Sequence, residues 1–238
     1  MMDSHGSTPL ENTGLTVFLA NLDALPLPSA SLTQFLTPGE LQRASRLAGD
    51  DLRRRWTMSR GLLRSLLGLL LQRDPGQIAL ERTPEGKPFL PGGPAFNLSH
   101  SGPYLLVAIT FRGDVGVDIE QHRPREDLDA LVTRYFAPQE AAEIGMLPVS
   151  ERSRAFLRTW VRKEAFLKGI GLGLQLPLSG FVVSVSREDG NVLRWVSDPG
   201  IREGGWQVAS VPAPQDAEAA VAWNDREVVP ILRPWPVS

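Results

Sequence analysis

The stretch WVRKEAFLK, residues 160–168, has the spacing of an amphipathic helix, yet charges lie where its apolar stripe should continue. Apolar residues recur at helical spacing up to Trp160, and one further turn of the same stripe reaches Glu164 and Lys168. Lys163 lies on the adjoining row. A surface Glu–Lys pair would explain this row, with a gain of only about 0.2–0.5 kcal/mol. An inward glutamate must instead be paired, protonated or bound to a metal, because burying a lone carboxylate is costly.

A second acidic pattern precedes this helix. The apolar run at residues 104–111 and the turn at 112–114 lead into VGVDIE, which predicts a β-hairpin. Period-two alternation puts Gly116, Asp118 and Glu120 on one face of the second strand. An exposed strand end with two solvated acids is one explanation. The other is a cation site, for which carboxylate oxygens favour magnesium over zinc.

Two polar motifs lie between the helices and the acidic strand. Residues 83–88 form a Pro- and Gly-rich turn that contains Lys87, and a lysine in a turn is usually solvated. In FNLSHSG, residues 96–102, alternation places Asn97 and Ser99 on one face, and His100 lies next to a Gly-Pro turn. Each motif alone is compatible with an ordinary loop or with a ligand contact.

The composition of the 238 residues is that of a globular protein, with 42% hydrophobic and 22% charged residues. A formal net charge of −2 argues against broad nucleic-acid binding, although a local basic site for phosphates remains compatible with it. The chain has no cysteine, which removes disulfides and thiolate chemistry. We expect a cytoplasmic protein with no membrane-spanning segment.

Hydrophobic periodicity predicts helices and strands along the whole chain. We expect a first strand at residues 15–22, and Thr37 as the N-cap of a helix over residues 38–47. A longer helix follows at about residues 50–72, and another begins near Pro138. Short strands are predicted at residues 181–185, 192–196, 206–211 and 219–223, and a proline-rich arm at 230–238.

This order of elements predicts an α+β fold built from two pseudo-symmetric lobes in one chain, with the acidic strand near their junction. We assign residues 1–14 to a mobile tail, 15–120 to an N-terminal lobe and 121–238 to a C-terminal lobe. Because one chain would supply both halves of the site, we expect a monomer.

Five pieces in series, GKP, FNLSHSG, GVDIE, FAPQE and WVRKEAFLK, resemble the phosphopantetheinyl transferases of the surfactin-synthetase-activating type. The resemblance covers about residues 85–168. It implies transfer of the phosphopantetheine arm of coenzyme A to a serine of an apo acyl or peptidyl carrier protein, with release of adenosine 3′,5′-bisphosphate. Such carriers serve polyketide, nonribosomal peptide or fatty-acid synthesis. The resemblance also implies a fold of two pseudo-symmetric α+β lobes in one chain, with the active site at their interface.

The resemblance also implies roles for particular residues. Asp118, Glu120 and Glu164 would hold Mg²⁺, with Mn²⁺ as a possible replacement. Contacts to the coenzyme are implied for these residues: Arg43, Lys87, Pro88, Ser99, His100 and Lys168. We add Lys163 to this group because it adjoins the ionic row. The match at Arg43 is looser, and the role of Glu140, the acid of FAPQE, stays open.

The residue types suit this chemistry, because splitting a pyrophosphate needs a cation and cationic side chains for the developing charge. Glu164 or Glu120 would accept the proton of the attacking serine, so that Glu164, Glu120 and Lys168 form the catalytic set. Two alternatives remain open: a non-catalytic module that binds carrier proteins, and a metal-dependent hydrolase of a pyrophosphate. The first does not need inward carboxylates, and the second leaves GKP and FNLSHSG unexplained.

Overall fold

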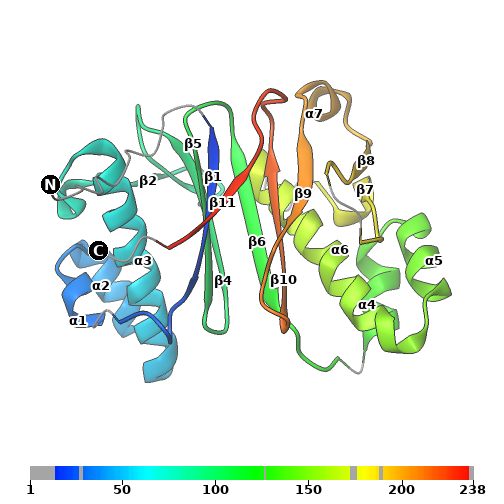
Figure 1. Cartoon of the computed structure of the whole chain (residues 1–238), viewed down its shortest axis with the longest axis horizontal. Coiled ribbons are helices and arrows are strands. Elements are labelled where there is room, and N and C mark those ends of the chain that lie inside the picture. The colour runs from blue at the N-terminus through cyan, green and yellow to red at the C-terminus, as the bar shows by residue number, and fades with distance from the viewer. Residues whose placement is uncertain (1–13, 27–28, 126, 172–175, 188–189, 236–238) are drawn as a thin grey trace, which may run out of the picture. The chain divides into compact units, whose positions relative to one another are not determined.

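The structure is a computed structural model that describes residues 14–26, 29–125, 127–171, 176–187 and 190–235. It combines helices and strands as an α+β protein (Figure 1). Contacts within the chain divide it into two units, one containing residues 26–79 and the other containing residues 15–25 and 80–238. The predicted boundary after residue 120 and the pseudo-symmetry of two lobes stay predictions. No helix within the described ranges is both long and apolar enough to cross a bilayer.

The unit of residues 26–79 is helical. Its helices are α1 (Ser29–Thr33), α2 (Pro38–Ser45) and α3 (Asp50–Leu71). Thr37 and Glu40 form the predicted capping box of α2, in which each side chain accepts a hydrogen bond from the other residue's backbone N–H. Gly61 lets α3 approach α1, because a Cβ there would clash with Leu32. The helices expected at residues 38–47 and 50–72 are therefore confirmed.

The second unit contains two main sheets, together with smaller strand pairs and helices. The first, of four strands, has the order β11 (Ile231–Pro234), β1 (Leu15–Asn21), β5 (Tyr104–Thr110) and β4 (Ala95–Ser101). The second, of three strands, has the order β6 (Val115–Gln121), β10 (Ala217–Trp223) and β9 (Gln207–Val211). Two further pairs are smaller: β2 (Glu81–Arg82) with β3 (Pro88–Phe89), and β7 (Phe181–Val183) with β8 (Leu193–Val196).

The predicted hairpin of residues 104–120 is wrong. Among the described strands, β5 is hydrogen-bonded to β1 on one side and to β4 on the other, so it has no free edge for β6. β6 pairs instead with β10, almost a hundred residues later in the chain. Consecutive strands usually pair, but here the turn at residues 112–114 carries the chain from one sheet to the other.

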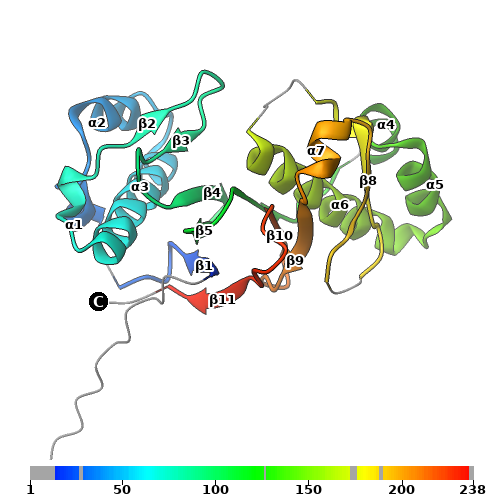
Figure 2. The same cartoon turned by 90° about the horizontal axis from the view of Figure 1, so that it is seen from above.

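The three-stranded sheet is covered on both faces. Val115, Val117 and Ile119 on one face of β6 join a core with side chains of β1 and β5. The opposite face of this sheet packs against α6 (Val149–Ile170), which lies alongside the sheet in Figures 1 and 2. The period-two alternation of β6 thus sends its apolar residues to one core and Gly116, Asp118 and Glu120 toward the helix.

Helices α4 (Leu128–Tyr135) and α5 (Pro138–Met146) precede α6, and the short α7 (Pro199–Glu203) follows β8. The sequence interpretation missed the short helices α1, α4 and α7, which contain five, eight and five residues. Helix α6 ends at Ile170, and its C-cap is Gly171, whose φ of 74° is left-handed.

Candidate functional site

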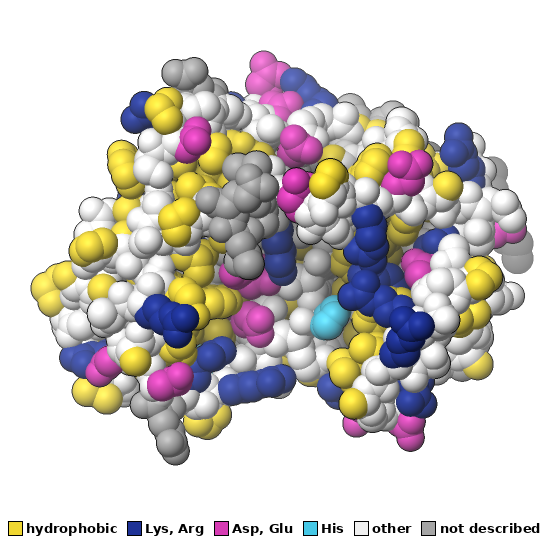
Figure 3. Space-filling model, turned by 180° about the vertical axis from the view of Figure 1, so that it is seen from behind, with side chains coloured by type: hydrophobic (Ala, Val, Ile, Leu, Met, Phe, Trp, Pro, Cys, Tyr) yellow, Lys and Arg dark blue, Asp and Glu magenta, His cyan; other side chains and the backbone are white. Residues whose placement is uncertain are grey.

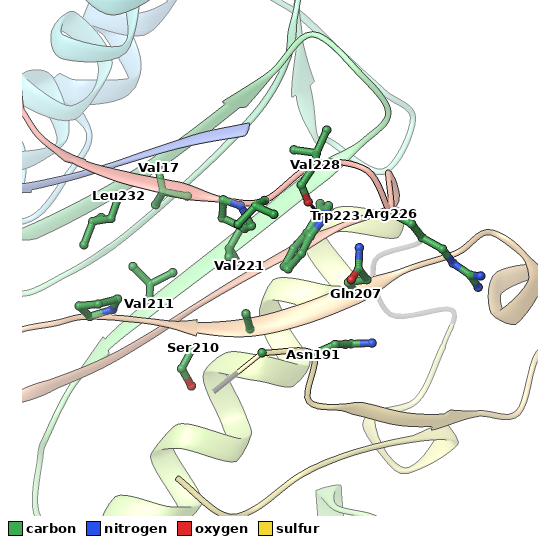
Figure 4. A pocket seen from close by; sticks show the side chains of 15 residues that line it. Val17, Asn191, Gln207, Ser210, Val211, Val221, Trp223, Arg226, Val228 and Leu232 are labelled. Carbon is green, nitrogen blue, oxygen red and sulfur yellow. Dashed lines mark hydrogen bonds between the residues drawn. The ribbon is translucent and has the colours of Figure 1, made fainter. Parts of the chain in front are cut away.

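Two cavities of the second unit have similar volumes but different chemistry. One, of about 350 Å³, is lined mainly by apolar side chains such as Val17, Val211, Val221 and Leu232, and Figure 4 shows Arg226 directed away from them. The other, of about 330 Å³, combines apolar and charged side chains. It is lined by Lys87, Pro88, Leu98, Glu164, Leu167 and Lys168, among others. Several charged side chains converge on the second cavity, and convergent polar groups in a pocket are typical of a ligand site, so we take the second cavity as the candidate.

A close approach of strand β6 to helix α6 positions the acidic side chains beside this cavity. A Cβ at Gly116 would clash with the carbonyl oxygen of Ala165 and the backbone nitrogen of Gly169, so only glycine permits this contact. Two residues further along β6, Asp118 points to the same side of the strand, toward the last turns of α6.

Asp118 lies at the centre of a small polar network. Its side chain is buried, and its Oδ1 accepts hydrogen bonds from Ser99 Oγ at 2.7 Å and from Lys168 Nζ at 2.6 Å. Lys168 also donates to Ser99 Oγ at 3.1 Å. The other carboxylate oxygen, Oδ2, is the one buried side-chain oxygen or nitrogen of the described residues that has no partner. A buried oxygen without a hydrogen-bond partner normally costs free energy, so Asp118 Oδ2 is suited to bind a ligand of this site.

Glu120 and Glu164 add two further carboxylates beside Asp118. Burial raises the pKa of Glu164 above its usual value, and the negative charges of Asp118 and Glu120 raise it further. Burial likewise raises the pKa of Glu120, against a hydrogen bond from Ser101 that favours the charged form. On the face seen in Figure 3, acidic side chains lie next to basic ones. The three acids therefore repel one another and are stabilised by positive charge.

Lys87 lies in the turn between β2 and β3, and its side chain lines the same cavity and contacts the end of α6. Its Nζ donates to the carbonyl oxygens of Gly169, at 2.9 Å, and Val115, at 3.3 Å. It therefore binds one of the last carbonyls of α6, where a helix carries partial negative charge. Burial lowers the pKa of Lys87, and the charge of Asp114 opposes that shift. Pro88 follows directly in β3 and lines the same cavity.

The donor set fits a hard divalent cation. Within the described residues, no three His, Cys, Asp or Glu side chains come close enough together to hold a metal ion as they stand. The partnerless Oδ2 of Asp118 nevertheless supplies a buried oxygen ligand, and Glu120 and Glu164 supply carboxylates that added positive charge would stabilise. Asp118, Glu120 and Glu164 are therefore the residues that would hold a divalent cation at this site.

The structure places Lys163 elsewhere. Its side chain is fully buried and pairs with Glu140 at 2.8 Å, and its Nζ donates to the carbonyl oxygens of Leu178 and Phe181. The predicted contact between Lys163 and the coenzyme has no geometric support here, because no part of the side chain is accessible. Glu140 is equally buried and accepts hydrogen bonds from Ala137 N and Val183 N. Its role in this structure is therefore to hold α5, α6 and β7 together.

Two other predicted residues are exposed in the structure. Arg43 is exposed in the last turn of α2, in the unit of residues 26–79. His100 is exposed between the buried Ser99 and Ser101, and strand alternation gives it the same face as Leu98, which lines the cavity. Contacts of Arg43 and His100 with the coenzyme stay predictions.

The sequence interpretation missed Ser101. Its Oγ donates to Glu120 Oε2 at 2.7 Å and accepts from Gln121 N at 3.0 Å. The signal was present, because the alternation that grouped Asn97 with Ser99 continues to Ser101 after two more residues. Ser101 is the last residue of β4 and directly precedes the turn at Gly102.

Two family models, which together cover most of the chain, both describe 4′-phosphopantetheinyl transferases. Residues 114–222 match the sequence model of the 4′-phosphopantetheinyl transferase superfamily. Residues 28–112 match the model described as 4′-phosphopantetheinyl transferase, N-terminal.

Individual relatives carry the same description. The chain is 40% identical to the 4′-phosphopantetheinyl transferase HetI of Nostoc sp. over 148 residues, which cover 60% of this chain and 62% of that relative. It is 31% identical over 203 residues to a putative 4′-phosphopantetheinyl transferase of Synechocystis sp., with 81% of each chain covered. It is also 31% identical over 160 residues to the transferase Sfp of Bacillus subtilis, covering 66% of this chain and 70% of Sfp.

Proposed function

Because this chain belongs to the 4′-phosphopantetheinyl transferase superfamily, we propose that it moves the phosphopantetheine arm of coenzyme A to a serine of an apo carrier protein. The serine oxygen forms a bond to the phosphorus that carries the arm, and the pyrophosphate bond on the other side of that phosphorus breaks. Adenosine 3′,5′-bisphosphate leaves, and the serine gives up its proton.

The observation that carries this proposal is the arrangement around Asp118. A buried carboxylate with one oxygen lacking a partner lies next to Lys168, and Lys168 lines a cavity together with Lys87. Pyrophosphate oxygens need both a divalent cation and cationic side chains as charge develops on the leaving group. Acids and lysines of the same site supply both kinds of group.

In this proposal Asp118, Glu120 and Glu164 hold Mg²⁺, which when bound neutralises the pyrophosphate charge. Lys168 leaves Asp118 Oδ1 to bind a phosphate oxygen, and its partly exposed side chain permits that exchange. Lys87 and Pro88 line the nucleotide side of the cavity. Ser99 forms hydrogen bonds with both Asp118 and Lys168 and thereby fixes the positions of these two side chains relative to each other.

Glu164 is the favoured acceptor of the serine proton, and Glu120 is the alternative. A carboxylate whose pKa is raised toward neutrality is a better base than an ordinary one. Burial and neighbouring negative charge raise the pKa of both glutamates in this structure, and Glu164 also lines the cavity. The monomeric state and the cytoplasmic location stay predictions.

The test is intact-mass analysis of an apo carrier protein incubated with this protein, coenzyme A and Mg²⁺. We expect the carrier to gain one phosphopantetheine, and adenosine 3′,5′-bisphosphate to appear in equal amount. A chelator should abolish the gain and added Mg²⁺ should restore it. Asp118→Asn, which keeps the shape but removes the charge, should slow transfer by more than about 10²-fold, since even residues that only support metal ligands cost 10–100-fold.

Other outcomes would contradict the proposal. Coenzyme A that is split while the carrier stays unmodified would indicate a hydrolase. Carriers that bind tightly but remain unmodified, with or without metal, would indicate a binding module. Full activity of Glu164→Gln would exclude Glu164 as an indispensable base or ligand.

A further inference from the structure

Three polar side chains of β4 connect the two sheets next to the acidic site. Asn97 Oδ1 accepts a hydrogen bond from Val117 N at 3.0 Å, and Ser99 and Ser101 donate to Asp118 and Glu120, each at 2.7 Å. In the described part of the chain, β4 forms a backbone ladder only with β5, and β6 only with β10. Side chains at alternate positions of β4 therefore replace the missing backbone ladder between β4 and β6.

The hydroxyl of Ser101 has only one way to orient its proton. Its oxygen accepts from the backbone N–H of Gln121 at 3.0 Å, so its single proton is directed to Glu120 Oε2. Ser101 is also buried, and Gly102 in the turn behind it lies close to the Gln121 side chain. The donor to Glu120 is thus fixed by the backbone before any ligand arrives.

Glu120 depends on this one donor more than Asp118 depends on Ser99. Asp118 Oδ1 is held by two side chains, Ser99 and Lys168. Among the described residues, the hydrogen bond from Ser101 is the one that reaches the Glu120 side chain. A glutamate has one more rotatable bond than an aspartate and loses more rotamer freedom when it is fixed. Removal of Ser101 would therefore leave Glu120 free to rotate.

We propose that Ser101 is a positioning residue that presets the Glu120 carboxylate for the divalent cation of the site. This inference rests on the proposed function, since it assigns a residue that supports one of the proposed cation ligands. Partners that orient the ligands of a metal contribute to its affinity because they remove the cost of ordering the ligand on binding. The Ser101 hydroxyl does this for Glu120 from a strand that supplies no proposed cation ligand itself.

The test measures cation binding directly. Mn²⁺ is titrated into the protein in the presence of coenzyme A, and free Mn²⁺ is followed by its paramagnetic resonance signal. Ser101→Ala should raise the Kd for Mn²⁺ by about 10–100-fold. In transfer assays the same variant should need correspondingly more Mg²⁺ for half-maximal rate, with kcat at saturating Mg²⁺ reduced only a few-fold.

Ser184→Ala is the matched control. Ser101 and Ser184 both have a relative exposure of 7%, and the Ser184 hydroxyl bonds Ser186 rather than any proposed ligand. Its Mn²⁺ affinity should equal that of the wild type, and thermal unfolding of both variants checks that they fold. Equal Mn²⁺ affinity of Ser101→Ala and Ser184→Ala would overturn the positioning role while leaving the transferase proposal intact. A wild-type protein that transfers the arm without any divalent cation would overturn the cation site and the positioning role, while the transfer itself would stand.

Discussion

Two lysines of helix α6, Lys163 and Lys168, each pair with a carboxylate, but in different surroundings. The pair of Lys163 and Glu140 is sealed, with both side chains 0% exposed. In the pair of Lys168 and Asp118 the lysine is 33% exposed and the aspartate 4%. The two ammonium–carboxylate distances are similar, 2.8 Å and 2.6 Å, so distance does not separate the two roles.

The two ion pairs differ in how completely their polar atoms are hydrogen-bonded. Lys163 donates to two carbonyl oxygens as well as to Glu140, and its Nζ lies 4.3 Å from the centre of the Phe181 ring. Its three donors are used, and no ligand can enter. Asp118 retains a buried oxygen without a partner, and Lys168 borders a cavity. A saturated buried pair connects the segments that bond to it, whereas an unsaturated pair beside a cavity is available to a ligand.

The largest effect should come from breaking the sealed pair. Lys163→Ala leaves the Glu140 carboxylate buried without its counter-charge, so the free energy of unfolding should fall by about 3–5 kcal/mol. Urea unfolding followed by tryptophan fluorescence measures this loss. The double variant Lys163→Met with Glu140→Gln removes both charges, and its single amide oxygen keeps an acceptor for one of the two donors, Ala137 N and Val183 N, so it should recover part of the lost stability. A loss below about 1 kcal/mol in Lys163→Ala would show that the pair does not hold the fold.

The same substitution at the open pair should affect activity instead. Lys168→Ala removes a cation from the cavity, and we expect transfer to slow by about 10²-fold, comparable to the loss of one donor that stabilises transition-state charge. Its free energy of unfolding should change by no more than about 1 kcal/mol, because the lysine is partly exposed and removing its side chain opens the buried Asp118 carboxylate to water from the cavity. If Lys168→Ala proves as destabilising as Lys163→Ala, the distinction between the two pairs fails.

The smallest effect concerns pH. Burial lowers the pKa of Lys163 from 10.5 to about 8, despite the opposing charge of Glu140. Between these values the unfolded chain binds a proton that the folded chain does not, so the contribution of Lys163 to the free energy of unfolding rises with pH in that window. The slope should reach at most about 1 kcal/mol per pH unit. Subtracting the unfolding profile of Lys163→Met with Glu140→Gln from that of the wild type isolates it, and a flat difference between pH 8 and 10.5 would contradict the burial effect.

The sequence correctly predicted the structural features that depend on local residue spacing. Capping residues located α2, helical periodicity located α3 and α6, and alternation put Asp118 and Glu120 on one face of β6. These features depend on residues a few positions apart, whose relative directions follow from the geometry of a helix or a strand.

The sequence was a poor guide wherever distant segments decide the outcome. The hairpin expected around residues 112–114 fails because both edges of β5 are already occupied by β1 and β4. Lys163 was assigned to the coenzyme because it adjoins the ionic row, whereas it bonds residues of another segment, Leu178 and Phe181. Neither outcome can be inferred from spacing along the helix or strand.

By itself, the sequence determined the class of the fold, the helix and strand that carry the acids, and the resemblance that suggested the transferase family. Only the tertiary structure decided which of two neighbouring lysines faces the cavity, and that Ser101 joins Glu120. The physical reason is that the direction of a side chain follows from local geometry, whereas its burial and its partners depend on which other segments pack against it.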